Sequence, residues 1–228
     1  MSDTFDPDSV EAVLFDSYGT LVDTASTARA LEGLVDDPEA VAAEWRENAL
    51  FYSVVANDLD QYRTYFELHR DGLRDALRAA GVDRSEERVA ELNAAYHDLD
   101  PFPDVDNVKR LAEAGYRPSI CSNGNPEMLE SLLEATGLGD SIAELVSAHD
   151  IRTLKPAREL YEHAATRVGN PPDRIAHVSA HWMDVQGAMH AGMQGIFLDR
   201  AGKHWPSFGP EPTCTVDSLS ELCDRLNV

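Results

Sequence analysis

From residue 101 onward, the chain alternates between short strand-like runs and helix-like segments. Such alternation predicts a parallel β-sheet, because each helix returns the chain to the edge at which the next strand begins. The expected strands are 12–15, 117–122, 143–147, 175–179 and 195–198, and the expected helices in this part are 125–137, 155–168, 183–191 and a last one after residue 217. The fold class predicted is α/β, with a doubly wound parallel sheet.

Between the first and second expected strands, residues 23–100 read as helices almost throughout, and no strand is expected there. Asp37 caps and Pro38 opens the first helix, residues 59–80 form a second that ends at Gly81, and Ser85 begins a third. We therefore predict a helical cap domain of residues 23–100, inserted into a discontinuous core domain of residues 1–22 and 101–228, with a cleft between them.

The net charge of −22 arises from 41 acidic and 19 basic residues spread along the whole chain. Phosphates would be repelled by such a surface, so nucleic acid is not an expected partner. No apolar run approaches the roughly 20 residues that span a bilayer, and the first residues have neither the basic nor the apolar part of a signal peptide. We expect no membrane association and a cytoplasmic location.

Cysteine and histidine spacing argues against a disulfide framework and a metal site. The three cysteines, Cys121, Cys214 and Cys223, are odd in number and show no CxxC spacing. His177 and His181 are four residues apart, but their stretch alternates like a strand, so their rings lack helical register. No metal ligands are predicted.

Polar residues gather where the expected parallel strands end. Neighbouring parallel strands bring such ends to one edge of the sheet, where α/β folds bind ligands. A carboxylate, a hydroxyl, an ammonium and a second carboxylate at one edge supply the parts for covalent catalysis. The residues are Asp16 with Thr20, Ser122 with Asn123, Lys155, and Ser179 with Asp184.

Four segments that contain these residues resemble, in order, the four signature motifs of the haloacid dehalogenase superfamily. They are residues 15–21 (FDSYGTL), 120–124 (ICSNG), 154–156 (LKP) and 178–184 (VSAHWMD). The resemblance extends over nearly the whole chain and implies a Rossmann-like core with a cap domain.

The position two residues after Asp16 indicates the subfamily. Phosphatases of the superfamily place a second aspartate there, whereas this chain has Tyr18. The form Asp-x-Tyr-Gly-Thr-Leu is similar to the L-2-haloacid dehalogenases, and so are Trp45-Arg46 followed by Tyr52, and Tyr161 six residues after Lys155.

The resemblance implies hydrolytic dehalogenation of short (S)-2-haloalkanoic acids to (R)-2-hydroxy acids. Asp16 would displace the halide from C2 and form an ester, which water then hydrolyses. Lys155 would pair with the negative charge of Asp16, and Thr20 and Ser179 would fix the orientation of its carboxylate. Asp184 with Lys155 would orient or activate the hydrolytic water. No cofactor is expected, because the substrate has no phosphoryl charge for Mg²⁺ to neutralise.

The resemblance also suggests which groups bind the substrate. Arg46 of the cap is expected to accept the halide, with Asn123 sharing that role, because a guanidinium stabilises charge that grows in the transition state. Ser122 and nearby backbone N–H groups would hold the substrate carboxylate. Tyr18 and Tyr161 are expected to line the pocket.

His181 departs from the subfamily pattern, which has asparagine at that position. The imidazole is expected to replace the amide as a hydrogen-bond partner, to serve as a base near its ordinary pKa of about 6.5, or to mark a different substrate. The sequence leaves these three roles open.

Two other functions remain as alternatives. One is a Mg²⁺-dependent small-molecule phosphatase that uses Asp16 and Asp184, against which Tyr18 argues. The other is a non-catalytic relative that binds a ligand, which the intact Asp16, Lys155 and Asp184 disfavour. A homodimer is expected only by analogy with the family.

The excess of carboxylates predicts a salt requirement, which a strongly halophilic cytoplasm would meet. Concentrated salt screens self-repulsion, because the Debye length falls to about 3 Å at 1 M. We expect the free energy of unfolding to rise with KCl concentration, as measured by thermal unfolding in KCl from dilute buffer to several molar. Full stability in dilute buffer would contradict this.

Overall fold

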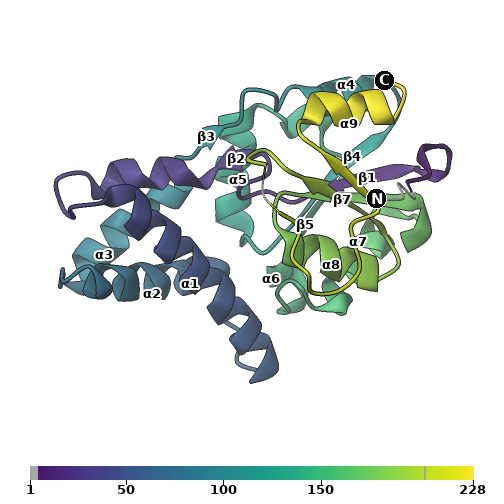
Figure 1. Cartoon of the computed structure of the whole chain (residues 1–228). Coiled ribbons are helices and arrows are strands. Elements are labelled where there is room, and N and C mark those ends of the chain that lie inside the picture. The colour runs from purple at the N-terminus through teal and green to yellow at the C-terminus, as the bar shows by residue number, and fades with distance from the viewer. Residues whose placement is uncertain (1–4, 203) are drawn as a thin grey trace.

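The computed structural model describes residues 5–202 and 204–228, and its centre is a six-stranded sheet (Figure 1). The strand order is β5-β4-β1-β6-β7-β8, and every neighbouring pair is parallel. The strands are β1 (Ala12–Phe15), β4 (Arg117–Ser122), β5 (Leu145–Ser147), β6 (Ile175–Ser179), β7 (Gln194–Leu198) and β8 (Cys214–Val216). The predicted doubly wound parallel sheet is confirmed. Residues 1–4 and 203, which the prediction assigns to the core domain, lie outside the described residues.

Helices cover both faces of this sheet. α4 (Asn107–Glu113) and α9 (Leu219–Arg225) lie on one face, and α7 (Arg158–Val168) and α8 (Trp182–His190) on the other (Figure 1). α5 (Pro126–Thr136) follows β4, and α6 (Ala148–Ile151) follows β5. All four residues of β1 are fully buried, as expected for a strand covered on both faces.

The side on which the chain adds strands to the sheet changes at β1, although all strands run in the same direction. The chain passes from β1 to β4 and β5 on one side, then returns to β6 on the other side and continues to β7 and β8. Such a switch point separates the loops at the carboxyl ends of the central strands, and the resulting crevice is where doubly wound sheets bind ligands. β1 ends at this crevice, immediately before Asp16.

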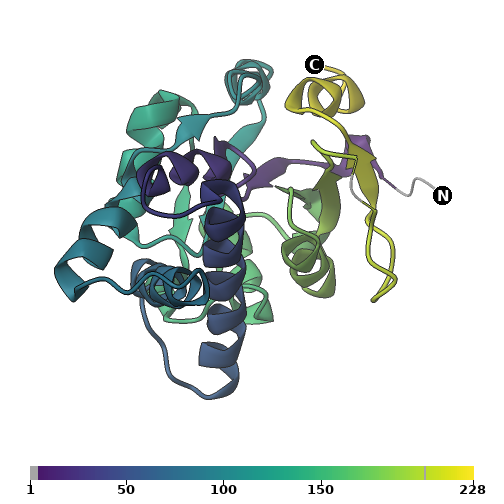
Figure 2. The same ribbon diagram turned by 60° about the vertical axis from the view of Figure 1, so that its left-hand side comes forward.

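Three helices stand to one side of the sheet: α1 (Pro38–Asp58), α2 (Tyr65–Ala79) and α3 (Glu86–Asn93) (Figures 1 and 2). α1 and α2 approach closely, since the Trp45 indole Nε1 donates to the His69 carbonyl over 2.7 Å. Gly72 permits this approach, because a Cβ at that position would lie 2.9 Å from the Trp45 carbonyl oxygen. The predicted caps at Asp37 and Ser85 are confirmed by their bonds to the first turns of α1 and α3.

A two-stranded antiparallel sheet pairs β2 (Val22–Asp23) with β3 (Asp100–Pro101). The chain therefore enters and leaves the helical block through one pair of strands. The expectation that no strand interrupts residues 23–100 is wrong at both ends of that range. The division into core and cap stays a prediction, and this pair lies at both proposed boundaries.

The second helix begins later than predicted. α1 continues to Asp58, and Asp60 then adopts a left-handed φ of 52°, which a helix cannot include. α2 starts only at Tyr65, where Thr64 and Glu67 form a reciprocal capping box. The predicted start at residue 59 is therefore wrong, because the hydrophobic pattern crosses the break without a change of period.

The short elements were not predicted from hydrophobic pattern. β8 has three residues, α6 has four and α4 has seven, so each spans fewer than two full periods, too few for a repeating pattern to show. No helix in the described part of the chain is long and apolar enough to cross a membrane.

Candidate active site

Asp16 follows β1 directly, and its backbone N–H continues the sheet pairing by donating to Val178 over 2.9 Å. The two carboxylate oxygens of Asp16 have separate partners. Lys155 Nζ donates to Oδ1 over 2.8 Å, and Thr20 Oγ1 donates to Oδ2 over 2.9 Å. Because Asp16 is 9% exposed, these bonds fix a nearly buried carboxylate at the edge of the sheet.

The turn after Asp16 requires a glycine. Gly19 has a φ of +85°, which other residues adopt at a cost, and a Cβ there would lie 3.4 Å from Arg46 Nη2. The turn brings Thr20 back toward Asp16, and the guanidinium of Arg46 lies against the turn.

Lys155 bridges two carboxylates, since its Nζ lies 2.8 Å from both Asp16 Oδ1 and Asp184 Oδ2. Burial lowers the pKa of Lys155, and the charges of Asp16 and Asp184 raise it by more. The net pKa is above that of an ordinary lysine, so the ammonium form is fixed at neutral pH.

Asp184 is held from three sides. Tyr161 donates its hydroxyl to Oδ1 over 2.7 Å, Lys155 donates to Oδ2, and His177 Nε2 lies 3.0 Å from Oδ2. Burial raises the pKa of Asp184, but His177 and Lys155 lower it further, so the net pKa lies well below that of a free aspartate. Asp184 is therefore a carboxylate at every physiological pH.

Ser122 and Asn123 form the turn after β4. Ser122 is fully buried, its Oγ lies 2.6 Å from Ser17 Oγ, and it accepts from the Gly124 N–H over 3.0 Å. Asn123 Oδ1 accepts from the Lys155 backbone N–H over 2.7 Å. The turn after β4 is thus bonded to both the Asp16 turn and the Lys155 segment.

Ser179 ends β6 close to Asp16. Its Oγ lies 3.5 Å from Asp16 Oδ2 and accepts from the His181 N–H over 3.1 Å. Thr20 Oγ1 also accepts from the Ala180 N–H over 3.0 Å. These bonds join the loops after β1 and β6, so four sheet-derived predicted positions converge on one edge.

A cavity of about 30 Å³ lies between this edge and helices α1 and α2. Seven of its lining residues were predicted site residues, and the other three were not singled out by the sequence. The seven are Asp16, Tyr18, Arg46, Asn123, Lys155, His181 and Asp184. The three are Leu50, Tyr65 and Met183.

Sequence signals exist for the three missed residues. Leu50 lies four positions after Arg46, which places both on one helix face. Met183 lies beside Asp184 at the start of α8. Tyr65 follows Thr64 in the pattern Thr-x-x-Glu, which marks the start of a helix and which a helix start at residue 59 does not use.

Four predicted residues do not line this cavity: Thr20, Ser122, Tyr161 and Ser179. Tyr161 donates its hydroxyl to Asp184 and is fully buried, so its link to the cavity passes through that carboxylate. Tyr161 is carried by α7, and its expected contact with the substrate stays a prediction.

Tyr18 and His181 bring polar atoms without protein partners to the cavity. Within the described residues, neither the Tyr18 hydroxyl nor His181 Nδ1 has a hydrogen-bond partner. Burial raises the pKa of Tyr18 well above its ordinary value. Burial and then the charge of Arg46 lower the pKa of His181. The phenol is therefore protonated and the imidazole neutral at pH 7.

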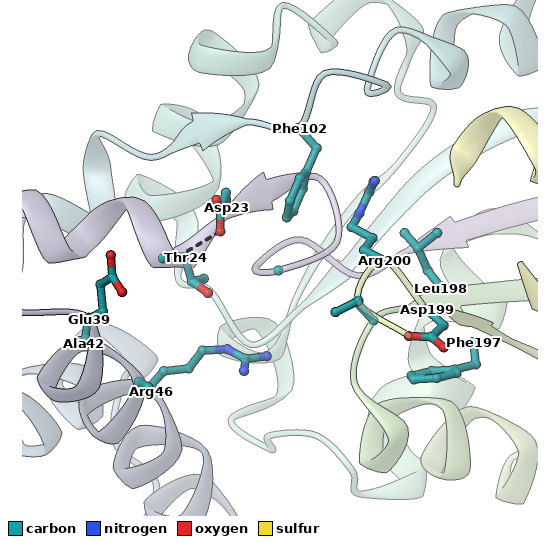
Figure 3. Close-up of a pocket in the computed structure, with 15 residues that line it drawn as sticks. Asp23, Thr24, Glu39, Ala42, Arg46, Phe102, Phe197, Leu198, Asp199 and Arg200 are labelled. Carbon is teal, nitrogen blue, oxygen red and sulfur yellow. Dashed lines mark hydrogen bonds between the residues drawn. The ribbon is translucent and has the colours of Figure 1, made fainter. Parts of the chain in front are cut away.

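Arg46 also lines a larger adjoining cleft of about 450 Å³. Its side chain reaches from α1 into this cleft, and Phe102 and Arg200 lie on the other side (Figure 3). Arg46 thus separates an outer cleft from the small cavity that contains the Asp16 carboxylate.

A family model described as haloacid dehalogenase-like hydrolase matches residues 10–192 of the chain. The chain belongs to this family of hydrolases. It is 34% identical to (S)-2-haloacid dehalogenase 4A of Burkholderia cepacia, over 94% of each protein. It is 31% identical to (S)-2-haloacid dehalogenase 1 of Pseudomonas sp. strain CBS-3, over 94% of this chain and 96% of that protein.

A solved structure, L-2-haloacid dehalogenase from Xanthobacter autotrophicus with chloropropionic acid covalently bound, superposes with a TM-score of 0.90. The sequences are 26% identical, and the match covers 96% of this chain and 98% of that one. The family and subfamily expected from the four motifs are therefore confirmed.

The substitution Lys155→Met would leave two buried carboxylates without their shared ammonium. We expect it to lower the free energy of unfolding by about 3–5 kcal/mol, as measured by urea unfolding at pH 7. Adding Asp184→Asn should recover part of this loss. Lys109→Met removes an exposed lysine paired with Asp106 and should change stability by less than about 0.5 kcal/mol. Equal effects at the two lysines would contradict the account.

Proposed function

We propose that this hydrolase cleaves the carbon–halogen bond of short (S)-2-haloalkanoic acids and releases (R)-2-hydroxy acids through an ester on Asp16. One observation carries the proposal: the Asp16 carboxylate faces a small cavity, with Lys155 and Thr20 on its oxygens and Arg46 across from it. A carboxylate needs no base to be ionised at neutral pH. It becomes an effective nucleophile once it is oriented and shielded from water.

In the first step, an Asp16 oxygen attacks C2 of the substrate from the side opposite the halogen. The new C–O bond forms as the carbon–halogen bond breaks, and the bonding electrons leave with the halide. C2 is inverted, and an ester joins it to Asp16. Arg46 stabilises the departing anion, with Asn123 as a second contact. The backbone N–H groups of the turn after β4 hold the substrate carboxylate, and Ser122, which is buried outside the cavity, supports that turn through its bond to the Gly124 N–H.

In the second step, water attacks the carbonyl carbon of the Asp16 ester. The bond from that carbon to the substrate oxygen breaks, so the hydroxy acid leaves with an oxygen that came from Asp16. The water oxygen remains on Asp16. Lys155 and Asp184 orient the water, and the neutral imidazole of His181 accepts one of its protons and passes it to the oxygen of the departing hydroxy acid. The second proton of the water is lost to solvent, which restores the Asp16 carboxylate.

The proposed reaction uses no cofactor, since a halide leaves without a phosphoryl group whose charge a metal ion would neutralise. Among the described residues, no group of three or more histidine, cysteine or acidic side chains is arranged to hold a metal ion. Mg²⁺ belongs only to the phosphatase alternative. The proposed partner is the small haloacid alone, and the cytoplasmic location and the homodimer remain predictions.

The proposal is tested with separate (S)- and (R)-2-bromopropionate in concentrated KCl with EDTA, followed by chiral chromatography of lactate. We expect the (S) form alone to give (R)-lactate. Asp16→Asn should abolish turnover, because an amide is not a nucleophile at this pH. Asp140→Asn, on an exposed residue, is the matched control and should keep full activity.

Two results would contradict the proposal. Lactate from neither enantiomer would remove dehalogenation and favour the phosphatase or binding alternatives. Lactate of retained configuration, or turnover that survives Asp16→Asn, would remove the inverting attack by Asp16.

A further inference from the structure

Asn57, in the last turn of α1, bonds to both backbone groups of Leu154. Its Nδ2 donates to the Leu154 carbonyl over 2.6 Å, and its Oδ1 accepts from the Leu154 N–H over 3.0 Å. A single amide side chain therefore replaces the partner strand that this loop residue lacks. Leu154 is fully buried, and its N–H depends on Asn57, whereas its carbonyl also accepts from the Ala157 N–H over 3.1 Å.

Leu154 directly precedes Lys155, whose own backbone N–H is bonded to Asn123 Oδ1 over 2.7 Å. Three consecutive backbone polar groups are thus fixed by side chains: the N–H and carbonyl of Leu154 from α1, and the N–H of Lys155 from the turn after β4. The backbone at Lys155 is held where its Nζ reaches both Asp16 and Asp184.

Asn57 also relates this segment to Arg46. The two residues are eleven positions apart on α1, and eleven residues make just over three full turns, so they lie on the same side of the helix. α1 is a single helix from Pro38 to Asp58. One rigid element therefore meets the site at two points, with Arg46 at the Gly19 turn and Asn57 at Leu154.

A second contact lies near the same loop. The Tyr62 hydroxyl is 3.0 Å from His149 Nδ1, and the Arg152 guanidinium lies 5.1 Å from the centre of the Tyr62 ring. His149 and Arg152 are exposed, so water competes for these contacts. The Asn57 amide is half-buried and bonds to a fully buried residue, which makes it the stronger link between α1 and the loop.

We propose that Asn57 is a positioning residue that acts through Lys155. It couples the placement of α1, and with it Arg46, to the placement of the ammonium between Asp16 and Asp184. The catalytic part of this inference rests on the proposed function. Its structural part, the fixing of the Leu154–Lys155 backbone, does not.

The kinetic test compares Asn57→Ala with Asn48→Ala. Asn48 is also a half-buried asparagine of α1, and its Nδ2 donates to the Gly72 carbonyl inside the cap, away from the Lys155 loop. A misplacement of about 1 Å in a site costs on the order of 100-fold in rate. We expect Asn57→Ala to lower kcat at least about tenfold, within that range, with a smaller change in KM, and Asn48→Ala to leave kcat near the wild-type value.

The pH profile separates positioning from general damage. Lys155 helps to lower the pKa of Asp184, so a displaced ammonium should move the acid limb of kcat/KM to higher pH. Asn57→Asp keeps the acceptor for the Leu154 N–H and loses the donor to its carbonyl, and should give an intermediate profile. An unshifted acid limb in Asn57→Ala, with kcat equal to that of Asn48→Ala, would overturn the inference.

Hydrogen–deuterium exchange of the Leu154 and Lys155 amides tests the structural part without any substrate. Loss of a buried hydrogen-bond partner should speed exchange at these amides by about tenfold or more in Asn57→Ala, and not in Asn48→Ala. Unchanged exchange would overturn the inference even if the enzyme dehalogenates. Faster exchange in a protein without haloacid activity would reject the proposed function and keep Asn57 as the residue that fixes Lys155.

Discussion

The ammonium of Lys155 lies 2.8 Å from carboxylate oxygens of both Asp16 and Asp184, and all three side chains are almost fully buried. Burying a charge is costly unless it is paired and hydrogen-bonded. One positive charge between two negative ones leaves a net negative site, which needs further donors. Thr20 donates to Asp16, and Tyr161 donates to Asp184, with His177 beside it. These groups come from three elements, the turn after β1, α7 and β6.

Most of the sheet and this edge could be predicted from the sequence, because both depend on local patterns. A buried strand reads as a short apolar run, and a polar residue at its end marks the edge, so Asp16, Ser122 and Ser179 follow without any tertiary information. Lys155 is one of three lysines in a chain rich in carboxylates, and this scarcity favours a special role for it. Its place between two of them requires the strand order, which spacing alone does not give.

Helices α1, α2 and α3 were harder to predict, and with them the side of the cavity that faces Asp16. Where α2 begins depends on a left-handed Asp60 and a capping box at Thr64, and neither changes the hydrophobic period that the sequence shows. Tyr65 therefore lines the cavity without having been predicted to do so. Tyr161 donates its hydroxyl to Asp184 and does not line this cavity. Asn57 offers no sequence signal at all, because its two partners are backbone groups 97 residues away.

The central claim is that Asp16 forms the ester and that water attacks the carbonyl carbon of Asp16 rather than C2 of the substrate. A single turnover in ¹⁸O-labelled water, with enzyme in excess over (S)-2-bromopropionate, tests it directly by mass spectrometry of the product and of the peptide that contains Asp16. The account predicts unlabelled lactate and one ¹⁸O atom in the Asp16 peptide. Label in lactate with an unchanged Asp16 peptide would mean that water attacks C2 directly, and would contradict the account.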